Sequence, residues 1–237
     1  MSDEKLLSEA VKLYNKGNAA GMHNDFTEAF ECFSKAAEYG YAPAQCNLGF
    51  CYEKGHGVPH DLTKAFDNYH KAAEQNYAPA QCNLGWCYES GFGTKQDLSK
   101  AVEYYRKSAE QGYAPAQGNL GFCFANGNGV TKDYIEAYEW FKKAALRGNV
   151  FAQYNLGECY ELGKGVAENI EKALEWYRKS AERGYAPAQN YLGSCYENGK
   201  GIPKNSLKAF EWYNHAAIQG YTIARQNLDN LTKRNLV

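Results

Sequence analysis

Residues 41–76 read YAPAQCNLGFCYEKGHGVPHDLTKAFDNYHKAAEQN, and this pattern returns along most of the chain at a step of 36 residues. The dipeptide Ala44-Gln45, the glycine Gly49 and the alanine Ala65 all recur at that step. Their counterparts are Ala80-Gln81, Ala116-Gln117, Ala152-Gln153 and Ala188-Gln189; Gly85, Gly121, Gly157 and Gly193; and Ala101, Ala137, Ala173 and Ala209. A fixed period of this length is typical of a solenoid, in which each repeat covers the apolar face of its neighbour. We therefore expect a repeat protein that binds a partner, since such arrays seldom catalyse a reaction.

Each repeat is expected to contain two helices separated by a glycine-rich turn. Pro43 suits the first position of one helix, where a missing N–H is harmless, and apolar residues follow it at helical spacing. The turn at 55–57 ends this helix, and Asp61 is a good N-cap for the second. Tyr69 and the alanines around it give the second helix a buried stripe. This helix ends at Asn76, where the other repeats carry glycine, and both residue types adopt a left-handed helix end easily.

The two ends of the chain depart from the pattern. The glycine and the alanine that recur in every repeat are 12 residues apart in the first repeat, from Gly17 to Ala29, and 16 residues apart in the others. The first repeat should therefore have a shorter turn and a longer opening helix. Residues 222–233 are expected to form a capping helix with Leu228 and Leu231 facing inward, because a terminal repeat needs a polar outer face.

The pattern Asn-Leu-Gly-x-Cys-Tyr-x-x-Gly-x-Gly-Val, followed by Asp, Lys-Ala, Tyr and Lys-Ala-Ala-Glu, resembles the Sel-like repeat family, a branch of the tetratricopeptide superfamily. The resemblance covers residues 41–220 as five repeats, whereas 4–40 is more similar to a plain tetratricopeptide repeat. It implies a right-handed superhelix of antiparallel helix pairs, in which the first helix of each pair lines a concave groove. It also implies an adaptor or scaffold that assembles protein complexes, although repeat type does not select the partner.

We accordingly expect an all-α, right-handed α-solenoid that occupies residues 1–237 as one domain. Its parts are a tetratricopeptide-like first repeat (4–40), five Sel-like repeats (41–76, 77–112, 113–148, 149–184, 185–220) and a C-terminal capping helix (221–237). Lys and Arg number 26 against 27 Asp and Glu, without a basic block, so we expect no nucleic-acid partner. No apolar stretch approaches the ~20 residues that span a membrane, and no signal-peptide core follows Met1.

Eight cysteines also bear on location. Five of them share one repeat position on the inward face of a helix, and Cys46 and Cys51 lie five residues apart, which suits a disulfide poorly. Buried reduced thiols are the better interpretation, and they favour a cytoplasmic protein.

Function is expected on the first helix of each repeat, where the repeats differ. The position of Phe50 carries Trp86 and Phe122 in the next two repeats and polar residues after that, while Tyr154 stands at the position of Cys46. Aromatic rings on a concave surface are typical anchors for an apolar side chain of a partner. The alternative is that these rings only fill the space between neighbouring first helices.

Two polar stripes run beside these rings. One consists of Asn47, Asn83, Asn119 and Asn155 and is broken by Tyr191. Side-chain amides both donate and accept, so such a ladder could hold an extended peptide backbone; alternatively, each amide bonds to a neighbouring loop or helix end. The other stripe, Glu53, Glu89, Glu161 and Glu197, either attracts basic partners or only solvates a face.

We find no pattern that supports catalysis. The Gly-Lys-Gly sequences at 163–165 and 199–201 lack the phosphate-loop pattern, and Cys51, His56 and His60 have no regular spacing for a metal. We therefore expect no enzyme activity, no cofactor and no metal site. The predicted function is a cytoplasmic adaptor that holds a peptide or helix of a partner protein in its groove. The alternative is a self-assembling structural protein or an idealised consensus repeat; the oligomeric state stays open, with a monomer favoured.

Overall fold

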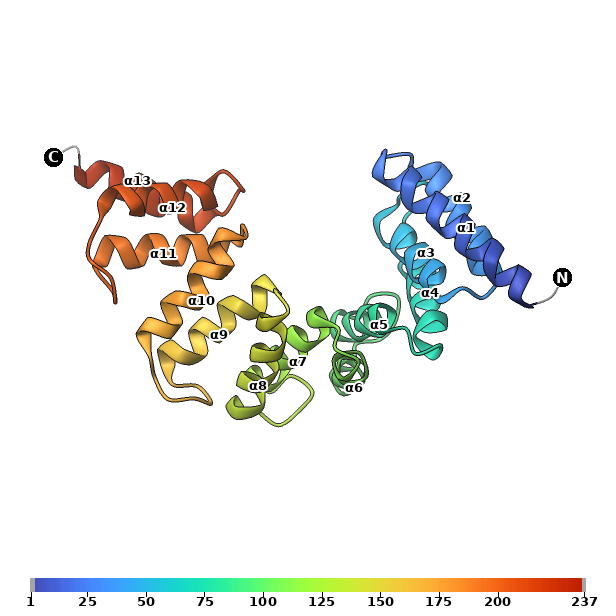
Figure 1. The fold of residues 1–237 in the computed structure, drawn as a ribbon, viewed down its shortest axis with the longest axis horizontal. Coiled ribbons are helices and arrows are strands. Elements are labelled where there is room, and N and C mark those ends of the chain that lie inside the picture. The colour runs from blue at the N-terminus through green and yellow to red at the C-terminus, as the bar shows by residue number, and fades with distance from the viewer. Residues whose placement is uncertain (1–2, 236–237) are drawn as a thin grey trace. The chain divides into compact units, whose positions relative to one another are not determined.

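Each repeat folds as a pair of antiparallel helices in the computed structural model, which describes residues 3–235 (Figure 1). This range contains thirteen helices and no strand, so the predicted all-α solenoid is confirmed. Residues 1, 2, 236 and 237 of the expected domain lie outside it. The first helices are α1 (Asp3–Met22), α3 (Ala42–Lys54), α5 (Ala78–Ser90), α7 (Ala114–Asn126), α9 (Val150–Leu162) and α11 (Ala186–Asn198). The second helices are α2 (Phe26–Glu38), α4 (Leu62–Glu74), α6 (Leu98–Glu110), α8 (Tyr134–Leu146), α10 (Ile170–Glu182) and α12 (Ser206–Ala217), and α13 (Thr222–Asn235) ends the chain.

Local sequence signals set the helix ends. Pro43 lies in the first turn of α3, and the Asp61 side chain accepts a hydrogen bond from the Lys64 backbone N–H at 3.0 Å to cap α4. Asn76 follows α4 with a φ of 60°, the left-handed conformation that glycine supplies in the other repeats. The first repeat has the longer opening helix that its spacing predicts, and Asp25 caps α2 by accepting from the Glu28 N–H at 3.0 Å.

Glycines allow close contact both within and between repeats. A Cβ at Gly49 would lie 2.8 Å from two ring carbons of Tyr69, so the absence of a side chain lets the tyrosine lie flat against α3. Gly57 makes the corresponding contact between repeats, because a Cβ there would lie 2.1 Å from the carbonyl oxygen of Phe26. Its φ of 71° is a second reason for glycine at this turn.

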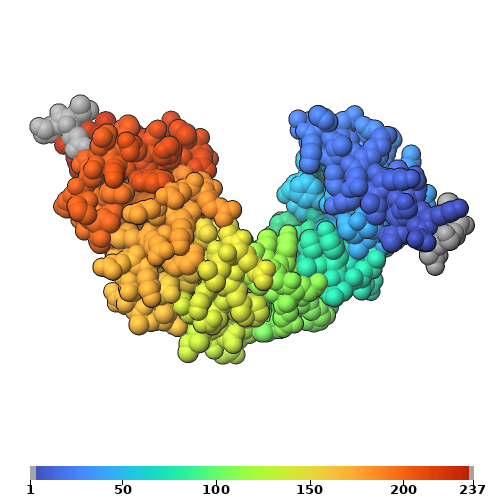
Figure 2. Space-filling view, in the orientation of Figure 1, coloured from blue at the N-terminus to red at the C-terminus, as the bar shows by residue number. Residues whose placement is uncertain are grey.

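The chain forms two compact units. The first comprises residues 1–116 and 128–131, and its core includes Ala29, Phe33 and Leu48. The second comprises residues 117–127 and 132–237, with core clusters around α10, α11 and α12. Within each unit successive repeats adjoin in the space-filling view (Figure 2).

The last helix closes one end of the second unit. Leu231 of α13 is buried against Ala209 and Tyr213, and Leu228 is partly buried beside them. None of the helices within residues 3–235 has the length and apolar character required to cross a bilayer.

Candidate functional site

A buried tyrosine on the second helix bonds to a glutamate on the first helix in four repeats. The hydroxyls of Tyr69, Tyr105, Tyr177 and Tyr213 donate to the carboxylates of Glu53, Glu89, Glu161 and Glu197 over 2.7, 2.6, 2.6 and 2.8 Å. Burial, reinforced by the bond to Glu53, raises the pKa of Tyr69, so its hydroxyl stays a donor. A buried hydroxyl requires an acceptor. These carboxylates therefore belong to the scaffold, a role that neither interpretation of the acidic stripe predicts.

The first repeat lacks this pair. When the first helices are aligned on Gly17 and Gly49, Gly21 takes the place of Glu53. When the second helices are aligned on Ala29 and Ala65, Phe33 takes the place of Tyr69. Phenylalanine needs no acceptor, so both polar groups are lost together. A Cβ at Gly21 would find its nearest neighbour, the Ala29 Cβ, 4.0 Å away, so the space beside this glycine is open.

That space forms a pocket of about 460 Å³ among α1, α2, α3 and the turn after α3. It is lined by Gly17, Asn18, Gly21, Met22, Phe26, Ala29, Phe33, Asn47, Phe50, Cys51 and His56. None of these side chains is a carboxylate, an ammonium or a guanidinium. The volume falls within the range of roughly 300–1,000 Å³ that is usual for ligand sites.

The mouth of the pocket exposes apolar side chains. The His56 ring stacks on Phe26 with 4.1 Å between ring centroids and meets the edge of Phe50 at 5.7 Å. Phe50 is 44% exposed and Met22 is 83% exposed. Single exposed apolar residues are ordinary, but several around one concavity mark a contact surface. Phe50, an anchor predicted from the sequence, therefore lies at the entrance to a pocket.

The predicted asparagine stripe is partly used within the scaffold. Asn47 donates to the Asn18 side-chain oxygen at 3.1 Å on one wall of the pocket. Asn83 donates to the Cys46 sulfur at 3.6 Å, and Asn155 donates to the Phe151 carbonyl oxygen at 2.8 Å. All three bonds lie inside the protein, but they go to the preceding first helix or to the same helix, and not to the loop or helix end that the alternative interpretation names.

The other predicted site residues are distributed over both units. In the first unit Trp86 is half-buried and packs edge-on against Phe92, with 4.8 Å between centroids. In the second unit Phe122 is 39% exposed and packs against Phe151, while Asn119 is partly buried on α7. Tyr154 is also partly buried, 5.3 Å from the ring of Tyr177. Among the predicted residues, the pocket brings Phe50 and Asn47 together.

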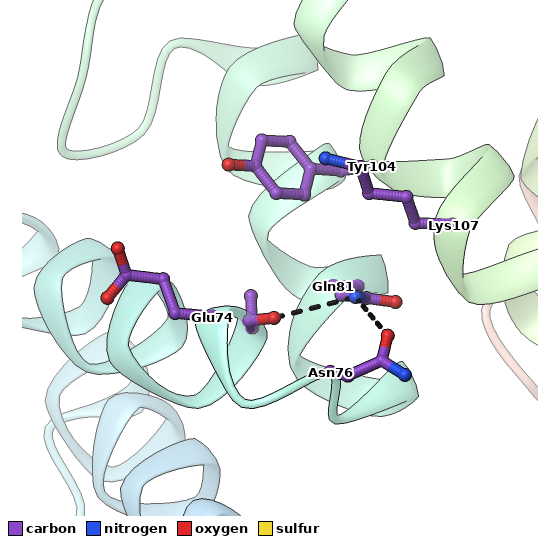
Figure 3. A pocket seen from close by; sticks show the side chains of 6 residues that line it. Glu74, Asn76, Gln81, Tyr104 and Lys107 are labelled. Atoms are coloured by element: carbon purple, nitrogen blue, oxygen red, sulfur yellow. Dashed lines mark hydrogen bonds between the residues drawn. The ribbon is translucent and has the colours of Figure 1, made fainter.

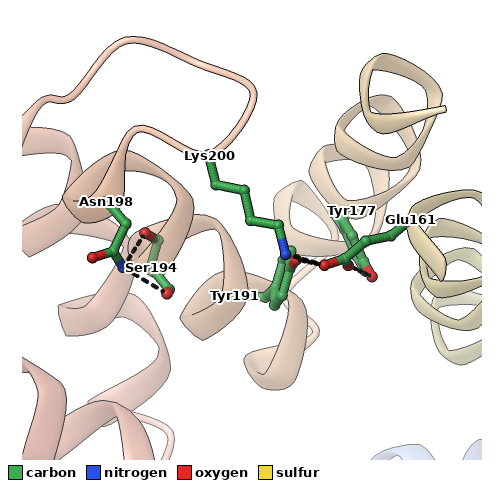
Figure 4. Close-up of polar contacts among 6 residues, drawn as sticks. All are labelled: Glu161, Tyr177, Tyr191, Ser194, Asn198 and Lys200. Carbon is green, nitrogen blue, oxygen red and sulfur yellow. Dashed lines mark hydrogen bonds and ion pairs between the residues drawn. The ribbon is translucent and has the colours of Figure 1, made fainter. Parts of the chain in front are cut away.

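A polar cluster joins two repeats of the second unit where tyrosine interrupts the asparagine stripe (Figure 4). Glu161 accepts hydrogen bonds from Tyr177 and Tyr191 and forms an ion pair with Lys200. Burial acts to raise the pKa of Glu161, but the Lys200 ammonium and the two hydroxyls together lower it below its usual range. The carboxylate is thus committed to holding adjacent repeats together.

A second pocket in the first unit, of about 290 Å³, is polar (Figure 3). The Asn76 side-chain oxygen accepts from Gln81 at 3.0 Å and from Gln111 at 3.1 Å. Lys107, also on its wall, bonds to Glu103 at 2.6 Å. Because its polar groups bond to one another or to their own helix, we interpret this pocket as part of the hydrogen-bonded contact between adjacent repeats.

The cysteines offer no reactive group. All eight are buried and free of disulfides. Burial raises the pKa of Cys46 to about 12 and that of Cys51 to about 11, which keeps both as neutral thiols. Within residues 3–235, no cluster of three or more His, Cys, Asp or Glu side chains is placed to hold a metal ion.

The repeat sequence and the helix pairs agree with one family. The Sel1 repeat model matches six times, over residues 6–41, 42–77, 78–113, 114–149, 150–185 and 186–221. The chain belongs to the Sel1 repeat family. Its first repeat is among the six matches, although its glycine-to-alanine spacing differs.

Solved structures support this assignment. A Sel1 repeat protein from Oxalobacter formigenes is 34% identical, with a TM-score of 0.82 over 91% of this chain and 86% of the other. A protective antigen of uropathogenic Escherichia coli with an SLR fold is 33% identical, with a TM-score of 0.58 over 98% of this chain and 59% of the other. Among curated proteins, DAP3-binding cell death enhancer 1 of Rattus norvegicus is 43% identical over 53 residues, or 22% of this chain. This Sel1 repeat protein matches only 10% of the length of that relative.

The pocket of this Sel1 repeat protein was missed by the sequence analysis, although a signal for it exists. The first repeat carries Gly21 where other repeats have Glu and Phe33 where they have Tyr. This replacement becomes visible when the first helix and the second helix of the repeat are aligned independently with those of the other repeats. Such an alignment must place a gap in the turn, which is shorter in the first repeat. The importance of the two replaced residues is evident only from the Glu–Tyr hydrogen bond in the structure of the other repeats.

Proposed function

We propose that this protein is a non-catalytic interaction scaffold whose N-terminal repeats hold a segment of a partner protein against α3 and α5. Sel1 repeat proteins generally act as protein-interaction scaffolds, and the rat relative is named for binding another protein. The eight free thiols suit a reducing compartment such as the cytoplasm.

The observation that carries the proposal is the exposed ring of Phe50 at the mouth of a pocket that no lysine, arginine, aspartate or glutamate lines. Aromatic side chains give large contact areas at little entropic cost, and a few of them usually dominate an interface. Trp86, at the same position in the next repeat, extends this surface along α5. In the second unit, taken by itself, the candidate contact residues are Phe122 at the position of Phe50, Asn119 and Asn155 at the position of Asn47, and Tyr154 at the position of Cys46.

Affinity capture from a lysate of the source cell tests the proposal. The wild type is compared with Phe50→Ala/Trp86→Ala and with a control, Phe210→Ala, which removes a ring of similar exposure (42%) from α12. We expect one or more proteins to be captured by the wild type and the control, and binding to the double variant to weaken at least about tenfold. Equal capture by a folded double variant would show that the site lies elsewhere. Light scattering on the purified protein covers the self-assembly alternative: a mass that rises with concentration would favour it.

A further inference from the structure

We propose that the pocket beside Gly21 holds one uncharged apolar side chain of an extended peptide, and that the Asn18–Asn47 amide pair binds the main chain of that peptide. This inference rests on the proposed function and narrows its site from the surface of α3 and α5 to a single pocket in the first repeat.

The pocket exists because one polar pair has been removed. In the other repeats that carry the pair, the glutamate side chain reaches across to the tyrosine hydroxyl. At the equivalent place Gly21 has no side chain and Phe33 has no hydroxyl, so this pair does not fill the space and leaves no carboxylate beside it. An apolar side chain from outside could occupy this volume without displacing a hydrogen bond of the protein.

The charge of the lining determines which side chain fits. A carboxylate or ammonium entering the pocket would lose water and find no lysine, arginine, aspartate or glutamate among the lining residues, and the His56 ring is stacked on Phe26. The Lys54 ammonium lies 5.7 Å from the ring centre of Phe50 at the pocket mouth, but it is already paired with Glu53 at 2.6 Å. Glu53 in turn also accepts from the Tyr69 hydroxyl at 2.7 Å. A neutral apolar side chain is therefore the complementary occupant. Met22, at the rim, has a flexible thioether that can adapt to its shape.

The amide pair indicates how the chain carrying that side chain is held. The bond from Asn47 to Asn18 uses one donor of Asn47 and one acceptor site of Asn18. No other hydrogen bond of these two side chains occurs within residues 3–235, so the Asn18 amino group and the Asn47 oxygen are available. An extended peptide presents an N–H and a C=O at its edge, whereas a helix uses both internally. One donor and one acceptor beside an apolar pocket match an extended segment.

Nuclear magnetic resonance of the methionine methyl groups gives a direct readout. The chain contains two methionines, Met1 and Met22, so ¹³C-methyl labelling yields one signal at the pocket rim and one reference. The probes are N-acetyl-phenylalanine N-methylamide, as the neutral occupant, and N-acetyl-glutamate N-methylamide, as its charged counterpart. We expect the first to shift the Met22 signal with saturation at roughly millimolar concentration, and the second to bind at least about tenfold more weakly.

The decisive variant is Gly21→Glu/Phe33→Tyr, which installs the pair that four other repeats contain and fills the pocket while retaining the fold. It should abolish the Met22 response to the phenylalanine probe. The matched control, Ala125→Glu/Phe141→Tyr, installs the same pair in the repeat 113–148 and should leave that response unchanged. Circular dichroism checks that each variant is folded.

Three results would overturn the inference. They are an unchanged response in the folded Gly21→Glu/Phe33→Tyr variant, equal binding of the two probes, or a Met22 shift that follows protein concentration without probe, which would assign the pocket to a second copy. The capture experiment separates this failure from that of the proposed function. Partners lost with Phe50→Ala/Trp86→Ala but retained by Gly21→Glu/Phe33→Tyr would leave the scaffold standing and remove the pocket. Probe binding at Met22 without any captured protein would support the pocket and contradict the proposed scaffold function.

Discussion

Two glycines on α1 should respond in opposite directions to the same substitution. Gly17 and Gly21 lie one helical turn apart, and neither has a left-handed backbone. A Cβ at Gly17 would lie 2.7 and 2.9 Å from two ring carbons of Phe33 and 3.1 Å from the Cβ of Cys32. A Cβ at Gly21 would have no neighbour closer than 4.0 Å. Gly17→Ala should therefore destabilise the first repeat, and Gly21→Ala should stabilise it.

The magnitude follows from two opposing effects. Alanine stabilises a helix interior by about 0.8–1 kcal/mol relative to glycine. At Gly17 the new methyl group collides with a buried ring, and such overpacking costs about 1–3 kcal/mol. The net effect is a loss of up to about 2 kcal/mol. At Gly21, in the last turn of the helix, a gain of about 0.5 kcal/mol remains.

Urea unfolding monitored by circular dichroism measures the two changes, and amide hydrogen exchange localises them. Localisation matters because a repeat array need not unfold in one step. Protection of α1 and α2 should fall in Gly17→Ala and rise slightly in Gly21→Ala. If Gly17→Ala proved as stable as Gly21→Ala, the tight contact with Phe33 would be wrong, and so would the contrast between filled and open space that defines the pocket.

Three further predictions concern the scaffold. Glu161→Gln should lower the free energy of unfolding at pH 7 by about 1.5–3 kcal/mol, since it weakens bonds to a charged acceptor. Because the fold lowers the pKa of Glu161, its contribution is present above the usual value near 4.5 and lost as the pH falls below it; acid titration of unfolding should therefore be flatter for the variant. The buried thiols, Cys46 among them, should react with a disulfide reagent at pH 8 at least about 100-fold more slowly in the native protein than in urea, and rapid native labelling would refute their burial. Asn76→Gly should change thermal stability little, because relief of the left-handed backbone offsets the lost bonds to Gln81 and Gln111, whereas Asn76→Ala should cost about 1–2 kcal/mol.

The helix pairs could be predicted from the sequence because their signals are local. Pro43 and Asp61 act within one turn of their own helices, and Asn76 acts through its own backbone angle. The 36-residue period then multiplies each local signal across the chain. Fold class, turns and caps therefore needed no knowledge of which side chains touch.

Contacts between helices are harder to predict from the sequence. The sequence predicts a solvated surface position for Glu53, because glutamate is usually exposed, yet its partner, Tyr69, lies 16 residues away on the other helix. The asparagine stripe shows the same limitation. The repeat identifies a shared position, but only the packed structure shows that Asn47 pairs with Asn18 while Asn83 bonds to Cys46. Periodicity reports that a position is constrained, not which neighbour constrains it.

Loss of the polar pair does not create a pocket in every repeat where it occurs. The repeat 113–148 also lacks it, with Ala125 and Phe141 in place of Glu and Tyr. There the ring of Phe151 packs against Phe141 with 6.4 Å between centroids. The ring of Tyr14 packs against Phe33 in the first repeat at 5.9 Å, so a neighbouring ring does not distinguish the two repeats. In the first repeat, however, Gly21 removes even the methyl group of alanine. Asn18 stands where the next repeat has the ring of Phe50, and it presents an amide instead of filling the space. The first repeat therefore combines three departures from the repeat pattern. Gly21 and Phe33 open space, and Asn18 places an amide beside that space. Because all three occur in one repeat, a binding site explains them better than imperfect packing does.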